Sequence, residues 1–85
     1  MIIRWDPAKN ERLKLDRCIS FEELLQAEVI GKFGNQKRKN QQMLLVLHDH
    51  YIWVIPYVED KNGVFLKTAF PSRKFMRMYL KGELI

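Results

Sequence analysis

Apolar positions recur along the chain with two different periods, which separate a helical first part from a strand-rich second part. Residues 20–31 begin with a capping box, Ser20 to Glu23, and end at Gly31, a residue placed to stop a helix. Between them the apolar side chains fall at helical spacing: Phe21, Leu24, Leu25 and Val29. Three continuous apolar runs follow, at residues 43–47, 51–58 and 64–70. Their length and their β-branched and aromatic content predict strands.

The two ends of the chain add shorter elements. Residues 1–5 alternate weakly and suit a short strand, after which Asp6 and Pro7 mark a helix start as N-cap and first helical residue, with the helix ending near Arg17. Residues 31–42 are polar and basic, and predict a loop or an irregular edge strand. Near the end, Ser72 can cap a short last helix, which presents Phe75, Met78, Tyr79 and Leu80 on one face.

Tight connections between the apolar runs predict how the strands pair. Residues 48–50 leave little room between two strands, and residues 60–63, Asp-Lys-Asn-Gly, form a strong hairpin turn. Pro56 cannot donate to a ladder, so its strand is either bulged there or turns that amide position outwards. We therefore predict one α+β domain over residues 1–85: a short N-terminal strand, two helices, an antiparallel meander of three to four strands and a short C-terminal helix.

Composition limits the class of protein. The 85 residues suffice for one domain, and 47% hydrophobic residues suffice for a packed core. Cys18 is the single cysteine of the sequence, which excludes an internal disulfide and a thiol-rich metal cluster. No apolar run approaches the roughly 18 residues of a membrane helix. We expect a cytoplasmic protein that needs no metal or other cofactor and does not bind membranes.

Positive charge is gathered in the second part of the chain. Residues 1–30 hold five Lys and Arg against six Asp and Glu, whereas residues 31–85 hold ten against four. Segregated charge of this kind attracts polyanions, and RNA is the partner that we predict. The alternative is a basic surface that serves solubility alone.

Two groups of polar side chains could contact RNA or act on it. A basic loop, Lys37-Arg38-Lys39, lies among amide side chains, and can bind phosphates. His48 and His50 are the only histidines of the sequence and stand where one strand turns into the next. Imidazole titrates near neutral pH, so either could move a proton when a 2′-hydroxyl attacks a phosphate. Ordinary surface residues remain the alternative for both groups.

A third group lies where the last strand becomes the last helix. Strand alternation predicts Lys67 and Ala69 on one face and Leu66, Thr68 and Phe70 on the other. Ser72 and Arg73 then open the helix, whose free amides and dipole favour a phosphate, with Arg73 as a bidentate clamp. The alternative is that Ser72 only caps and Arg73 is only exposed. Further candidates for RNA contact are two basic helix residues and two tyrosines that could stack on bases: Lys74, Arg77, Tyr51 and Tyr79.

Three segments together resemble one known family. They are residues 5–10 (Trp-Asp-Pro-Ala-Lys-Asn), residues 19–23 (Ile-Ser-Phe-Glu-Glu) one helix later, and, more loosely, residues 66–74. In these segments and in the order of its elements, the chain resembles the BrnT family of toxins from bacterial type II toxin–antitoxin pairs. Two places depart from that family's pattern: Asp16, Arg17 and Cys18 stand where many members carry Lys-His-Gly, and Phe70 stands where an arginine is usual. Arg73, three residues on, is the candidate to replace that arginine.

The resemblance implies a small ribonuclease with the broad fold of RelE-like toxins, which inhibits translation by cutting RNA and is neutralised by a DNA-binding antitoxin. On this hypothesis the chain is a metal-independent endoribonuclease acting on messenger RNA, free or on the ribosome, and a cognate antitoxin is its protein partner. Lys67 and Arg73 would hold the phosphate, His48 or His50 would transfer the proton, and Lys9 of the matching motif is a further candidate. The alternatives are an RNA- or ribosome-binding module without catalysis, and an inactive toxin homologue that acts through protein contacts.

Overall fold

Capping residues and hairpin turns divide the described part of the chain into six strands and three helices. The computed structural model describes residues 2–34 and 40–84. The elements are β1 (Ile2–Trp5), α1 (Pro7–Arg17), α2 (Phe21–Leu25), β2 (Glu28–Gly34), β3 (Gln42–His48), β4 (Tyr51–Asp60), β5 (Gly63–Leu66), β6 (Phe70–Pro71) and α3 (Arg73–Leu80). All three helices begin where the sequence predicts, because Asp6, Ser20 and Ser72 each accept a hydrogen bond from a backbone N–H of the first turn. No helix in the described part of the chain is long and apolar enough to cross a membrane.

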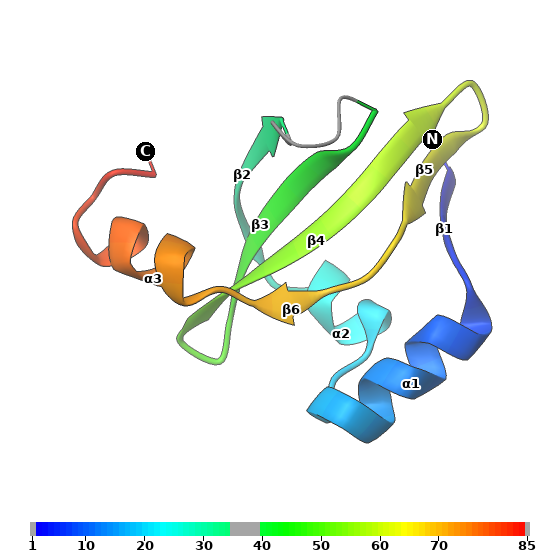
Figure 1. The fold of residues 1–85 in the computed structure, drawn as a ribbon, viewed down its shortest axis with the longest axis horizontal. Coiled ribbons are helices and arrows are strands. Elements are labelled where there is room, and N and C mark those ends of the chain that lie inside the picture. Colours follow the sequence, from blue (N-terminus) through cyan, green and yellow to red (C-terminus); the bar gives the residue numbers. More distant parts are fainter. Residues whose placement is uncertain (1, 35–39, 85) are drawn as a thin grey trace.

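The strands form one mixed sheet in the order β1-β5-β4-β3-β2, with β6 pairing separately with β4 (Figure 1). The meander from β2 to β5 is antiparallel, as predicted. β1 joins β5 in parallel, with Ile2 beside Gly63 and Trp5 beside Leu66. The N-terminal strand therefore pairs with the free edge of β5 and becomes the outermost strand on that side of the sheet. The α+β class is confirmed. The sheet is mixed, because β1 pairs in parallel with β5 while the other strand pairs are antiparallel.

Two predicted boundaries are wrong. The second helix ends at Leu25, and Gly31, expected as its stop, lies inside β2. Residues 28–34 instead pair with β3, with a register shift between Val29 and Gly31. The predicted helix is shorter because these residues form strand β2 at the edge of the sheet. The third apolar run is also broken, since residues 67–69 are not strand.

That break changes which side chains share a face. Strand alternation predicted Lys67 and Ala69 on one face of the sheet and Leu66 and Phe70 on the other. This prediction is wrong, because Leu66 and Ala69 lie buried in the same core cluster. The break also explains Pro56. The carbonyl of Pro56 accepts from the amide of Lys67 at 2.8 Å, and the N and C=O of one strand residue point to the same side. The missing N–H of Pro56 therefore faces the break between β5 and β6, and β3 and β4 pair without interruption.

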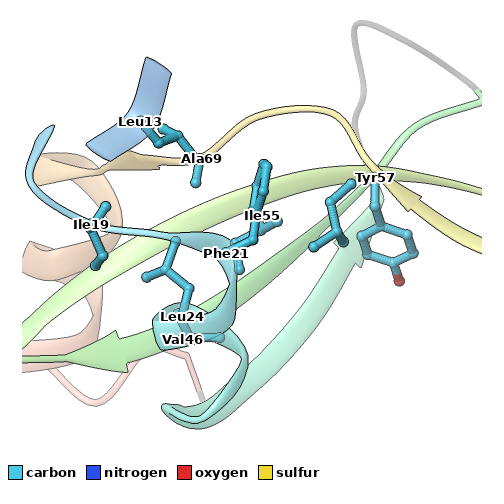
Figure 2. Close-up of a cluster of buried hydrophobic side chains, with 9 residues drawn as sticks. Leu13, Ile19, Phe21, Leu24, Val46, Ile55, Tyr57 and Ala69 are labelled. Carbon is cyan, nitrogen blue, oxygen red and sulfur yellow. The ribbon is translucent and has the colours of Figure 1, made fainter. Parts of the chain in front are cut away.

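Each face of the sheet carries its own core. On one face, which we call the α1–α2 face, Leu13, Ile19, Phe21 and Leu24 pack on side chains of β3 and β4 (Figure 2). On the other, the α3 face, Leu45, Ile52 and Val54 pack with Leu84 and with Phe75 and other side chains of α3. Because successive strand residues point to opposite faces, the continuous apolar runs at residues 43–47 and 51–58 are those of two strands, β3 and β4, that contribute side chains to both cores.

Candidate nucleic-acid interface

An open hollow of about 460 Å³ lies on the α1–α2 face, at the tip of the β3–β4 hairpin. The joint between α1 and α2, the hairpin and β6 all contribute to its wall: Arg17, Cys18, Ile19, His48, Asp49, Tyr51, Trp53 and Pro71. One histidine, one arginine and two aromatic side chains from three separate parts of the chain therefore meet here. We call it the tip hollow.

The hairpin positions His48 and Tyr51 side by side. They are direct partners at the end of the ladder, so the turn between them has two residues, Asp49 and His50. Both turn residues have positive φ, 51° and 65°, which is the backbone of a type I′ turn. This confirms the tight connection predicted at residues 48–50. The turn points His50 into solvent at the tip, outside the lining of the hollow, whereas His48 is half-buried within it.

The joint between the two helices places Arg17. α1 ends at Cys18, which adopts φ 56° and donates its backbone N–H to the carbonyl of Lys14 at 3.2 Å. The buried Asn10 then ties the helices together: its amide oxygen accepts from the backbone N–H of Phe21 at 2.8 Å, and its amide nitrogen donates to Glu22 at 2.7 Å. Arg17, exposed in the last turn of α1, is thereby held at the rim of the tip hollow.

Hydrogen bonding in this joint also sets the charge of Glu22. The amide of Asn10, followed by the backbone N–H of Glu22 itself, holds the pKa of the Glu22 carboxyl below its ordinary value of 4.5. Glu22 lies in the first turn of α2, where the positive end of the helix dipole favours a carboxylate. The joint therefore keeps a negative charge at the start of α2. Arg17, at the end of α1, has no ion-pair partner among the described residues.

The start of α3 lies close to the same hairpin. Pro71 pairs with Trp53, and the amide of Ser72 donates to the carbonyl of Ile52 at 3.0 Å. The hydroxyl of Ser72 caps the helix by accepting from the amide of Phe75 at 3.2 Å. Arg73 is the first helical residue and is exposed, as are Lys74 and Arg77 farther along. Of the predicted strand-to-helix group, Ser72 and Arg73 thus lie next to the tip hollow, although they do not line it.

Lys67 lies elsewhere. Its backbone is level with Pro56, about 17 Å along β4 from Tyr51 at the usual rise per residue. Its ammonium sits 5.6 Å from the centre of the Phe65 ring, and Phe65 pairs with Val58, farther still from the hairpin tip. Thr68 follows it in the irregular segment and is half-buried. The structure does not bring Lys67 together with either histidine.

The remaining predicted residues are also spread over the surface. Lys9 is half-buried on the first turn of α1, about 12 Å along the helix axis from Arg17. Tyr79 packs against the core of the α3 face, so its ring is not free for a base. The basic loop Lys37, Arg38 and Lys39 falls outside the described residues.

Of the residues that line the tip hollow, only His48 and Tyr51 were predicted site residues, and two of the others, Arg17 and Trp53, could contact RNA. Arg17 stands where the resembled family carries a histidine, and that correspondence was the one available signal for it. In the sequence, Trp53 is one of several aromatic residues in an apolar strand. The structure pairs it with Pro71 and places both in the wall of the hollow. Within residues 2–34 and 40–84, no group of three or more His, Cys, Asp or Glu side chains could hold a metal ion.

Comparison of the chain with protein-family models, with curated proteins and with solved structures finds no match.

Proposed function

We propose that the protein is a metal-independent endoribonuclease of the toxin class that the resemblance implies, acting on single-stranded RNA at the tip hollow. The observation that carries the proposal is the meeting of His48, Arg17 and Tyr51 in one open hollow beside the start of α3. Cleavage through the 2′-hydroxyl needs a base, an acid and positive charge at the phosphate, and needs no metal.

The chemistry divides among these side chains as follows. The imidazole of His48 takes the proton of the 2′-hydroxyl, whose oxygen attacks the adjacent phosphorus and expels the 5′-oxygen of the next nucleotide. The products are a 2′,3′-cyclic phosphate and a free 5′-hydroxyl. The leaving oxygen needs a proton, for which the hydroxyl of Tyr51 is the candidate donor. The guanidinium of Arg17 stabilises the charge that builds on the phosphoryl oxygens.

Two features favour a single strand as substrate. The wall of the tip hollow includes the rings of Tyr51 and Trp53, and an unstacked base can pack against an aromatic ring. α3 begins two residues after Pro71 of the hollow, and its exposed Arg73, Lys74 and Arg77 can bind the phosphates of a strand that leaves the hollow at this end. A duplex would keep its bases stacked and could not use the aromatic wall.

A binding module without catalysis is the second candidate. The observation that favours it is the separation of Lys67 and Lys9 from the tip hollow, which leaves Arg17 as the one cation that lines the hollow among the described residues. Such a protein would hold RNA or a ribosomal surface through the same residues without cutting it. An inactive homologue that binds a cognate antitoxin is a variant of this candidate.

The two candidates differ in what happens to RNA. The purified protein is incubated with single-stranded RNA in the presence of a metal chelator, and the 3′ ends of the products are analysed. Cleavage to cyclic-phosphate ends that His48→Ala and Arg17→Ala each reduce by about a hundredfold or more supports the nuclease. Binding without cleavage, weakened by the same substitutions, supports the module. A result with neither binding nor cleavage rejects the nuclease and the RNA-binding module, and leaves the inactive homologue that binds a cognate antitoxin.

A further inference from the structure

Two aromatic rings and a lysine form a row on the α3 face of the sheet, along the segment where β5 is followed by β6 beside β4 (Figure 1). Phe70 pairs with Val54, which is buried in the core of the α3 face. Phe65 pairs with Val58, four residues farther along β4, so both rings lie on that face. The ammonium of Lys67 sits 5.6 Å from the centre of the Phe65 ring and shares the face with it. We call Phe65, Lys67 and Phe70 the aromatic–cation row.

One extra residue between Lys67 and Phe70 creates the row. The amide of Lys67 donates to the carbonyl of Pro56, whereas Phe70 pairs with Val54. Three residues therefore advance the chain by as much as two residues of β4, which is the count of a β-bulge. A bulge turns the side chain that follows it to the other face. Without the extra residue, Phe70 would point into the core of the α1–α2 face, where Ala69 is buried instead.

The row is evenly spaced and open to solvent. The β4 residues beside its members are two apart, which sets neighbouring members about 7 Å from one another along the strand. Phe70 is 36% exposed, Lys67 is exposed and Phe65 is half-buried. Among residues 2–34 and 40–84, Phe70 has no ring or cation against it, and Lys67 has no ion-pair partner. The Phe70 ring and the Lys67 charge are therefore available to a ligand.

Arginines stand at both ends of the row, and only one of them has its charge free. At the β5 end, the guanidinium of Arg4 lies 5.8 Å from the centre of the Phe65 ring, but it also pairs with the carboxylate of Asp60 at 3.2 Å. At the β6 end, Arg73 begins α3 three residues after Phe70. It is exposed, and no ion-pair partner for it lies in the described part of the chain. The order aromatic, cation, aromatic, cation therefore runs from Phe65 to Arg73.

We propose that the aromatic–cation row binds single-stranded RNA, as a second contact surface for the part of the strand that lies outside the tip hollow. Each nucleotide carries one base and one phosphate, so rings that stack bases, alternating with cations that hold phosphates, match a single strand. An acidic protein segment would use the cations and leave the rings without a partner. The inference rests on the proposed function for its ligand, single-stranded RNA, and requires no cleavage.

The row meets the tip hollow at β6. Pro71 lines the hollow on the α1–α2 face, and its neighbour Phe70 points to the α3 face. Within the described residues, β6 pairs with β4 alone, so its other edge carries no strand. A single strand of RNA can therefore cross this edge and contact the hollow on one face and the row on the other.

Fluorescence anisotropy with a 2′-O-methyl RNA of about 12 nucleotides tests the row without cleavage, because a methylated 2′-oxygen cannot attack the phosphate. Phe70→Leu keeps an apolar side chain but removes the ring, and should weaken binding by about tenfold. Phe70→Trp keeps a ring and should bind within about twofold of wild type. Lys67→Ala should lower the slope of log affinity against log salt by about 0.7, because one phosphate contact to a single strand is lost.

A matched ligand and a matched variant serve as controls. The ligand is an abasic strand with the same number of phosphates, whose affinity Phe70→Leu should leave unchanged because there is no base to stack. The variant is Lys61→Ala, which removes an exposed cation of the β4–β5 turn outside the row and should leave the salt slope unchanged. The circular dichroism of each variant is compared with wild type, so that a loss of folding is not taken for a loss of contact.

Full affinity in folded Phe70→Leu, or an equal loss of affinity for the abasic strand, would overturn the proposal. A polyglutamate peptide that binds the wild type and is weakened by Phe70→Leu would assign the row to an acidic protein instead. Cleavage that depends on His48, with unchanged binding in Phe70→Leu, would keep the nuclease and reject the row. The row alone would stand if Phe70→Leu weakened binding and wild type cut no RNA. A wild type that does not bind the oligonucleotide would reject the row outright.

Discussion

At the scale of single residues, Cys18 carries a conformation that its side chain disfavours. It ends α1 with φ 56°, a left-handed position that glycine adopts without a steric penalty. The family that the chain resembles carries glycine at this position. Cys18 replaces that glycine, but the backbone still adopts the left-handed conformation that glycine favours.

We expect Cys18→Gly to raise the free energy of unfolding by about 1 kcal/mol, because the left-handed position no longer opposes a Cβ. Urea unfolding measures it. Leu15→Gly is the matched control: it puts glycine at an exposed position inside the same helix, where about 1 kcal/mol should be lost. Equal losses from both substitutions would mean that the left-handed turn at Cys18 does not form.

His50 offers a second test at this scale, because it also has positive φ. His50→Gly should stabilise the type I′ turn by up to about 1 kcal/mol. It should also leave RNA binding and cleavage within about twofold of wild type, because His50 lies outside the tip hollow. Thermal unfolding and the cleavage assay measure the two effects. Loss of cleavage on this substitution, with stability kept, would assign the proton transfer to His50 instead of His48.

At the scale of elements, the contact between α1 and α2 depends on the charge of Glu22. Its pKa is lowered by Asn10, so the folded state favours the carboxylate, and this share of stability is present above about pH 4.5. It is lost as the pH falls through the lowered pKa. We expect the free energy of unfolding to fall below about pH 4.5 and to fall less steeply in Glu22→Gln, whose amide oxygen can still accept from Asn10. Urea unfolding across this pH range measures both; identical slopes would argue against the hydrogen bond.

Local signals predicted the elements well where side chains act on their own backbone. Asp6, Ser20 and Ser72 each cap a helix as the sequence indicates, and residues 60–63 form the expected hairpin turn. The failures come from pairing between distant segments. Val29 sits at helical spacing behind Leu25, yet the open edge of β3 draws residues 28–34 into the sheet. Likewise, residues 67–69 lose their alternation where the chain passes from β5 to β6.

The site was predicted less well than the elements because its members come from separate elements. The sequence pointed to His48 and Arg73, which the fold does bring near one hairpin tip. It also pointed to Lys67, and only the register with Pro56 shows that this residue lies at a distance. Arg17 carries no local signal of function, since an arginine in the last turn of an exposed helix is common.

At the scale of the whole molecule, charge determines how RNA should bind. The formal net charge is +5, and α3, which begins two residues after Pro71 of the tip hollow, carries the exposed cations Arg73, Lys74 and Arg77. We expect the affinity for single-stranded RNA to fall steeply with salt, by a factor of about ten or more between roughly 50 and 200 mM. Fluorescence anisotropy with a labelled oligonucleotide measures this.

A matched pair of variants shows whether the charge of α3 matters in particular. Arg73→Ala/Arg77→Ala should flatten the salt dependence, because two phosphate contacts are lost. Arg12→Ala removes an exposed cation that pairs with Asp16 on α1, and should leave the dependence unchanged. Equal effects from α3 and from Arg12 would indicate diffuse attraction and not a binding surface along α3.

The central claim is that the tip hollow cleaves RNA, and the most direct measurement is the product of a single-stranded RNA incubated with the purified protein and a chelator. We predict fragments that end in 2′,3′-cyclic phosphate, made by wild type and by His50→Gly, and reduced by about a hundredfold or more in His48→Ala and Arg17→Ala. Intact RNA with wild type, or cleavage that survives the loss of both His48 and Arg17, would contradict the account.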